Sequence, residues 1–140
     1  MNTKLLSLLI ALFLCLPLSA QHQKESVPRV DSNGIFLVPD KMPEFPGGMQ
    51  AMMKYLSTNV KYPADAQKRG VSGRVIVQFV VMEDGTLGQE KVVRGVDPLL
   101  DEEALRVVKA MPRWSAGMAD GKAVKVRFTI PIMFLSLIHI

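Results

Sequence analysis

The sequence predicts a two-layer α+β domain in which two helices cover one face of a three-stranded sheet. Apolar residues recur at helical spacing in two segments and alternate along two others, and a third strand, over residues 87–94, has a more polar and looser pattern. The segments follow one another as helix, short helix, strand, hairpin strand, helix and strand. Strands with one apolar face need a second layer to cover that face, and the two helices can supply it. The domain takes up roughly 90 residues, an ordinary size for a single domain.

The first 20 residues are typical of a secretory signal peptide. Lys4 precedes an apolar run over residues 5–18, and the small residues Ser19 and Ala20 follow. We expect cleavage between Ala20 and Gln21. The alternative is an uncleaved membrane anchor, which the run of about 14 residues disfavours because a spanning helix needs about 20.

The single cysteine, Cys15, lies inside this leader. A lipoprotein would use it as the lipidated residue, but the preceding Leu14 is bulkier than the small residue normally found there. Removal of the leader leaves no cysteine, and therefore no disulfide and no thiolate metal ligand. It also leaves 16 basic and 13 acidic residues, a net charge of +3. Because the signs alternate and form no basic block, nucleic acid is not an expected partner.

The sequence favours a binding protein over an enzyme. The two histidines, His22 and His139, fall outside the predicted domain, so it has no imidazole general base. Asp101, Glu102 and Glu103 are interpreted as a helix cap and first-turn acids rather than catalytic carboxylates. The Gly47-Gly48 pair lacks the strand before it and the lysine after it that a phosphate loop requires. No metal constellation is present, and we expect no cofactor.

The domain is predicted to start near Phe45, after a linker over residues 21–44. A first amphipathic helix ends near Asn59, and we interpret its methionine stripe as core packing. The stripe recurs at i, i+3, i+4 and i+7 as Met49, Met52, Met53 and Leu56. Pro63 and Gly70 then bracket a short helix, in agreement with the preference for proline at the start and glycine after the end.

Two strands are predicted next, joined by a hairpin. Val75, Val77, Phe79 and Val81 share one face of a strand over residues 73–82. Asp84-Gly85 predicts a type I′ turn, whose two central residues need positive φ, and residues 87–94 return as the second strand. Asp101 is predicted to cap the second long helix, and Pro112 ends it. Trp114 is interpreted as a packed corner residue rather than a ligand platform, and residues 116–121 as a loop.

The final strand has the cleanest alternation in the sequence. One face is apolar, with Val124, Val126, Phe128, Ile130, Ile132 and Phe134. Pro131 cannot donate a ladder hydrogen bond, which predicts that this strand lies at an edge of the sheet. An unpaired edge can add a strand from another protein. Alternatively, Pro131, Lys125 and Arg127 only protect the edge from aggregation, and the pattern leaves both interpretations open.

An ordered set of motifs resembles the C-terminal domain of the TonB energy-transducer family. The set comprises Tyr62-Pro63, Ala66-Gln67, Gly73, Val75 to Phe79, Asp84-Gly85, Val92-Val93, Leu100-Asp101 to Ala104, Pro112, Trp114 and a strand ending at Phe134. The stretch from Met42 to Phe134, with Pro43-Glu44-Phe45-Pro46-Gly47-Gly48, resembles the version found in Bacteroidetes-type bacteria. No single motif is specific, but their order and spacing are.

The resemblance implies a non-enzymatic periplasmic domain with a three-stranded antiparallel sheet and two helices packed on one face. Its partner would be the TonB box of TonB-dependent outer-membrane receptors, added as a strand to support energy-coupled import. Carried over to this chain, the pairing residues are Val124, Lys125, Val126, Arg127, Phe128, Thr129 and Ile130. The segment that approaches the receptor in the family corresponds to Asn59, Val60 and Lys61.

The chain departs from full transducers at both ends. The linker over residues 21–44 reaches at most about 80 Å and is not proline-rich. Contact with an inner-membrane, proton-driven motor complex is expected only if the leader stays uncleaved, and the domain otherwise binds without transmitting force. Two alternatives are a free periplasmic adaptor of the same fold, similar to TolA, and a homodimer paired through the edge strand. The domain is predicted over residues 45–134, and residues 135–140 form an atypical tail that we interpret as not native.

Overall fold

The computed structural model describes residues 28–135. The predicted leader, its cleavage site and most of the tail lie outside these residues. The helices and strands follow in the order α2 (Gly48–Asn59), α3 (Ala64–Lys68), β1 (Gly73–Val81), β2 (Leu87–Arg94), α4 (Pro98–Lys109), β3 (Gly117–Ala119), β4 (Lys122–Val124) and β5 (Val126–Phe134).

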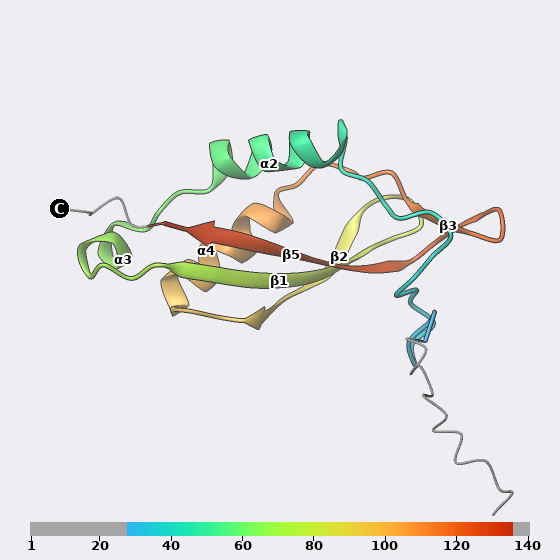
Figure 1. Cartoon of the computed structure of the whole chain (residues 1–140), viewed down its shortest axis with the longest axis horizontal. Helices are drawn as coiled ribbons and strands as arrows, with labels where there is room; N and C mark the ends of the chain where they lie inside the picture. The colour runs from blue at the N-terminus through green and yellow to red at the C-terminus, as the bar shows by residue number, and fades with distance from the viewer. Residues whose placement is uncertain (1–27, 136–140) are drawn as a thin grey trace, which may run out of the picture.

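The main sheet has three antiparallel strands in the order β2-β1-β5, so β1 is central and β5 is an edge. In Figure 1, α4 crosses behind the sheet and α2 runs alongside β5. Val75, Val77, Phe79 and Val81 of β1 are fully buried, as their alternation predicts. The predicted α+β class, with a three-stranded antiparallel sheet and helices, is confirmed.

The methionine stripe of α2 is only half buried. Met52 and Leu56 join the core, whereas the side chains of Met49 and Met53 are 62% and 59% exposed. The prediction that the whole stripe packs in the core is therefore wrong for these two residues. α2 runs alongside the edge strand β5 (Figure 1), and one flank of its apolar face is left uncovered by the sheet.

Helix α4 begins one turn earlier than predicted. Asp97 is the N-cap, and its side chain accepts a hydrogen bond of 3.0 Å from the backbone N–H of Leu99. Pro98 takes the first helical position, where its missing N–H costs nothing. Asp101, the predicted cap, lies within the first turn, and its carboxylate accepts from the N–H of Val96 at 3.0 Å.

The β1–β2 hairpin is confirmed, but its turn is not type I′. Gly85 has a φ of 85°, whereas Asp84 has no positive φ. The N–H of Gly85 donates to the carbonyl of Met82, and the N–H of Met82 donates to the carbonyl of Thr86. A glycine in the left-handed region after a turn with negative φ is the usual three-residue hairpin loop. Asp84 instead accepts hydrogen bonds from the N–H and hydroxyl of Thr86.

The predicted last strand is divided in the structure. Val124 belongs to β4 and pairs with Gly117 of β3, so it lies outside β5. The predicted loop over residues 116–121 is the tip and one arm of this small hairpin. Alternation alone could not show the break, because apolar residues continue at even positions on both sides of Lys125.

The chain before α2 is packed on the domain, which differs from the predicted linker. Phe36 forms a parallel bridge to Val126, Lys41 pairs with Met118, and Glu44 pairs with Ser115. The side chain of Ile35 is only 3% exposed. Single bridges of this kind leave no periodic pattern in a sequence, so residues 29–44 looked irregular. We call the part over residues 29–38 the N-terminal strap.

Candidate functional site

Within the described residues 28–135, the outer edge of β5 is occupied only at its start. The N–H of Phe36 donates to the carbonyl of Lys125 at 2.8 Å, and the N–H of Arg127 donates to the carbonyl of Phe36 at 2.9 Å. Beyond Arg127, the described residues 28–135 supply no backbone partner on this side of β5. The strand order confirms that β5 is an edge strand, as Pro131 predicts.

The hydrogen bonds of Arg127 show which backbone groups face outward. Its N–H points away from β1, and the register between β1 and β5 has no interruption. Since backbone direction alternates along a strand, the amides and carbonyls of Thr129 and Met133 also face outward. The ring nitrogen of Pro131 takes the outward position between them, so the proline costs no hydrogen bond with β1. The open edge therefore offers two N–H donors and three carbonyl acceptors.

The opposite edge of the sheet is protected. In β2, Gln89 has a positive φ of 53°, and the pairing of β2 with β1 is irregular at two points. Glu90, Lys91 and Arg94 add charges along this strand. Irregular pairing and charge both discourage strand addition. β5 carries no charged residue from Phe128 to Phe134, so it is the edge suited to a partner.

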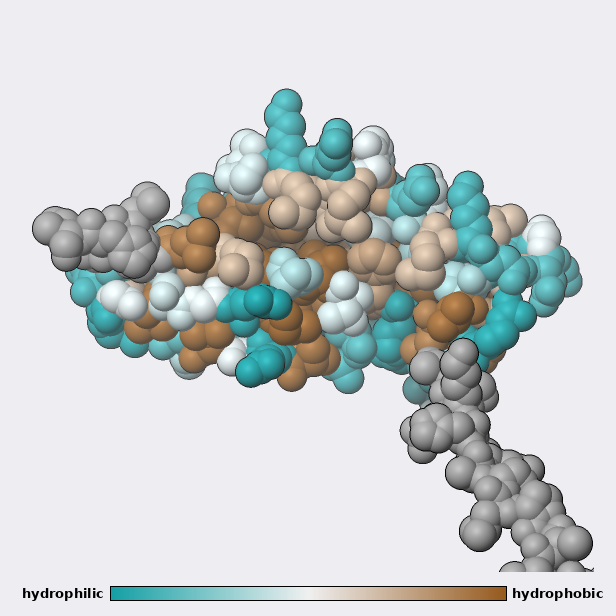
Figure 2. Space-filling model, viewed as in Figure 1, coloured by the Kyte–Doolittle hydropathy of each residue, from teal (hydrophilic) through white to brown (hydrophobic). Residues whose placement is uncertain are grey.

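Two apolar hollows lie between β5 and α2. The first has a volume of about 360 Å³, and its lining includes Phe45, Met49, Met52, Trp114 and Phe128. The second has a volume of about 440 Å³, and its lining includes Met53, Leu56, Val60, Ile132 and Phe134. Figure 2 shows apolar side chains along the strip between α2 and β5 on this face. We call this strip, with its two hollows, the α2–β5 groove.

Trp114 forms part of the wall of the first hollow. It packs edge-on against Phe45, Phe79 and Phe128, with ring centroids 5.2–5.8 Å apart. Its backbone N–H donates to the carbonyl of Gly85, which ties this wall to the β1–β2 turn. The side chain is 4% exposed, so the packed-corner interpretation agrees with the structure. Its indole N–H has no hydrogen-bond partner among the described residues.

Among the predicted pairing residues, Lys125, Val126 and Arg127 are already engaged by the strap. The guanidinium of Arg127 lies 2.8 Å from the carboxylate of Asp31, and both side chains are largely buried. This hydrogen bond lowers the pKa of Asp31. Arg127 is therefore not a free cation for a partner. Thr129, with its outward backbone, is the predicted pairing residue best placed on the open edge.

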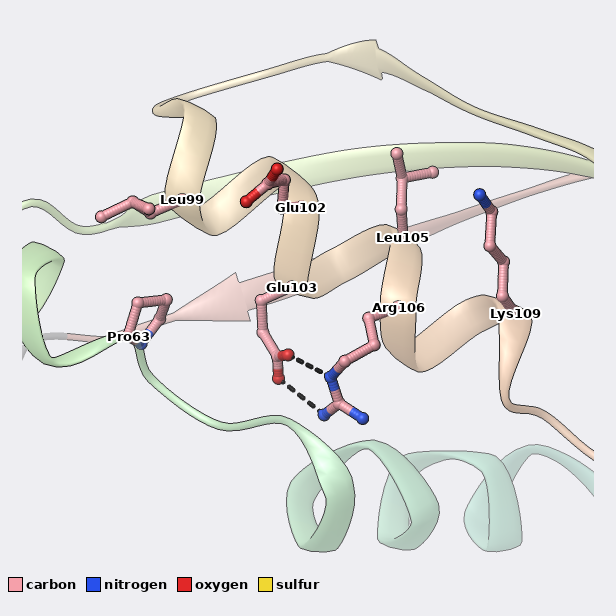
Figure 3. A pocket seen from close by; sticks show the side chains of 7 residues that line it. All are labelled: Pro63, Leu99, Glu102, Glu103, Leu105, Arg106 and Lys109. Atoms are coloured by element: carbon pink, nitrogen blue, oxygen red, sulfur yellow. Dashed lines mark hydrogen bonds and ion pairs between the residues drawn. The ribbon is translucent and has the colours of Figure 1, made fainter.

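The predicted receptor-approach segment is tied to α4. Arg106 donates to the carbonyl of Asn59 at 3.0 Å, and the N–H of Lys61 donates to the carboxylate of Glu103 at 2.7 Å. Figure 3 shows Glu103 and Arg106 joined by two hydrogen bonds, beside a shallow hollow of about 590 Å³ on α4. Only Val60 of this segment lines the α2–β5 groove.

Glu103 is a structural residue that sequence reasoning missed. The hydrogen bond from Arg106 is the main cause that lowers its pKa, and the N–H of Lys61 adds to it. Its side chain is 9% exposed, and because α4 begins at Pro98, Glu103 lies in the second turn and not in the first turn as predicted. The i, i+3 spacing of Glu103 and Arg106 was the available signal. With all its partners on this chain, Glu103 holds the end of the receptor-approach segment, at Lys61, against α4.

Residues 28–135 contain no group of three His, Cys, Asp or Glu side chains that could hold a metal ion. Within the same range, no helix is both long enough and apolar enough to cross a membrane.

Comparison with known proteins identifies the family. The model described as "Gram-negative bacterial TonB protein C-terminal" matches residues 58–135, more than half of the chain. A solution structure of the Helicobacter pylori TonB C-terminal domain is 27% identical, with 65% of this chain and 81% of that chain covered and a TM-score of 0.50. That of Pseudomonas aeruginosa TonB is 29% identical, with 57% and 81% covered and a TM-score of 0.45. The curated proteins gave no match. The Bacteroidetes-type version of the resemblance stays a prediction. The resemblance to TonB C-terminal domains is confirmed, and the chain belongs to the family of TonB C-terminal domains of Gram-negative bacteria.

Proposed function

We propose that this chain is a periplasmic, non-enzymatic binding protein that engages TonB-dependent outer-membrane receptors by strand addition to β5. Domains of this family in general interact with outer-membrane receptors. The observation that carries the proposal for this chain is the uncharged edge from Phe128 to Phe134, which has no backbone partner in the described part of the chain and lies beside the α2–β5 groove. In such a complex, backbone hydrogen bonds supply affinity and side-chain pockets supply choice.

The geometry shifts the proposed contact along β5. The strap occupies the edge at Lys125 and Arg127, and Val124 lies outside the strand, so pairing centres on residues 128–134. Thr129 and Met133 donate to the added segment, and their carbonyls accept from it. Val60 contributes through the wall of the second hollow.

Proline at position 129 tests strand addition. Thr129→Pro removes an outward N–H and leaves the ladder with β1 intact, as Pro131 already does. It should weaken binding of a synthetic receptor N-terminal segment at least about tenfold, because one of two donors is lost and the ring obstructs close approach. Proline at Val126 or Phe128 is unsuited, since those amides face β1.

Titration calorimetry with the full chain measures this effect, and circular dichroism shows whether the variants stay folded. Thr129→Val is the matched control, because it keeps the N–H and the side-chain shape, and it should bind normally. If a folded Thr129→Pro variant binds the segment as tightly as the parent chain does, strand addition at β5 is wrong.

We further propose that binding supports energy-coupled import. Cleavage or retention of the leader determines whether the domain is free in the periplasm or attached to the inner membrane. N-terminal sequencing of the protein from cells should find Gln21 as the first residue, which places the domain free in the periplasm. An intact N-terminus in the membrane fraction would contradict this and would make the proton-driven motor complex a partner.

A further inference from the structure

We propose that the α2–β5 groove selects the added strand, and that it takes an uncharged extended segment with apolar side chains four residues apart, one in each hollow. This inference rests on the proposed function and specifies the partner's chemistry. The exposed side chains of Met49 and Met53 lie over the two positions and supply the selection.

The spacing follows from the register of β5. In a sheet, residues opposite one another on neighbouring strands point to the same face. A segment added to β5 therefore directs the residues opposite Phe128 and Ile132 toward α2. Phe128 lines the first hollow and Ile132 lines the second. These two positions are four residues, or about 13 Å, apart along the strand.

The lining of the hollows defines which side chains fit. The second hollow has no charged side chain, and the first has only Glu44. A charged side chain buried in the second hollow would lose its hydration without gaining a salt bridge. Methionine is flexible and polarisable, so Met49 and Met53 can cover apolar side chains of different shapes. The groove therefore requires apolar character at two positions but does not require one particular residue.

The strap and Pro131 set the length and the pairing of the segment. Phe36 holds the edge as far as Arg127, so the open part extends from Phe128 to Phe134. A segment of about seven residues fills it, and a longer one must displace Phe36. Pro131 supplies no donor, so one carbonyl of the segment stays unpaired with β5.

A segment of another protein fits the groove better than a second copy of this chain. The β5 of a second copy has its apolar residues, including Ile130 and Ile132, buried in its own core. Those side chains cannot also fill the hollows of a neighbour. A free extended segment has both apolar positions available.

The test uses the full chain and a labelled, capped heptapeptide that begins and ends with valine and in which valine and threonine alternate, so that its valines face α2 when it pairs along residues 128–134. We expect Met49→Lys and Met53→Lys each to raise its dissociation constant about tenfold, measured by fluorescence anisotropy, because each loses apolar contact and adds a charge over a hollow. Val93→Lys is the matched control. Val93 is 47% exposed and lies on β2, so its substitution should leave binding unchanged.

Replacing the valine opposite Phe128 or the valine opposite Ile132 with glutamate should abolish binding, whereas glutamate at a threonine on the opposite face of the peptide should not. Normal binding by both methionine variants, with binding lost in Thr129→Pro, would overturn groove selection and leave strand addition standing. Normal binding by Thr129→Pro as well would overturn both. A homodimer that the peptide does not dissociate in analytical ultracentrifugation would show that a second copy occupies the edge, and would also overturn the inference.

Discussion

Glu103 shows how one carboxylate connects two distant parts of the chain. It binds the guanidinium of Arg106 on its own helix and the N–H of Lys61 in the receptor-approach segment. Losing the carboxylate would remove the acceptor of this part-buried hydrogen bond, and a typical intramolecular hydrogen bond contributes about 0.5–1.5 kcal/mol. The charge of Glu103 therefore holds the path of the chain between α2 and α3.

The same residue predicts a pH dependence of stability. The pKa of Glu103 is lower in the folded state than its ordinary value of 4.5, mainly because of Arg106. Its stabilising contribution is therefore complete above about pH 4.5 and is lost as pH falls through the lowered pKa. Urea unfolding of Glu103→Gln should show a weaker loss of stability on acidification than the parent chain. An identical pH dependence in both proteins would contradict this assignment.

Among elements, α4 shows what a sequence pattern leaves undecided. Both Asp97 and Asp101 are plausible caps, and the choice depends on whether Pro98 is a turn residue or the first helical residue. The structure places Pro98 in the helix and gives Asp97 two tasks, capping Leu99 and pairing with Arg69. The long helices, the first strand and the last strand followed from periodicity, because burial of one face imposes it. The hairpin followed from Asp84-Gly85, and the edge position of the last strand followed from Pro131.

Replacing the cap of α4 should have a measurable cost. Asp97→Ala removes the acceptor for the N–H of Leu99 and should lower the free energy of unfolding by about 1 kcal/mol. Asp97→Ser keeps an acceptor and should retain most of the stability. Thermal or urea unfolding measures both. Equal stability of Asp97→Ala and the parent chain would show that the cap contributes nothing.

At the scale of the whole molecule, the open edge of β5 and the α2–β5 groove depend on contacts between distant segments, which no local sequence pattern predicts. The exposure of Met49 and Met53 depends on how far α2 extends past β5, and the occupied part of the edge depends on Phe36, more than 80 residues earlier in the chain. Sequence reasoning identified β5 as the edge through Pro131. It could not find the strap, because single bridges and the Asp31–Arg127 ion pair have no periodic signature.

Hydrogen exchange should report this arrangement along β5. Amides that face β1, such as those of Phe128 and Ile130, should exchange slowly, and those of Thr129 and Met133 quickly. Arg127 should be protected through Phe36. Addition of a receptor segment should slow exchange at Thr129 and Met133. Slow exchange at those two amides in the free protein would contradict an open edge.

The position of the strap also determines where tension enters the domain. The described chain begins at one end of the molecule, and β5 ends at the other (Figure 1). A pull on the chain before residue 28 would therefore reach the Phe36–Val126 bridge and the Asp31–Arg127 pair before it reached the core. Those few bonds would open first and lengthen the free edge of β5 toward Val126. A strand already paired with β5 would then form further backbone hydrogen bonds near Val126, so that tension would strengthen binding instead of weakening it.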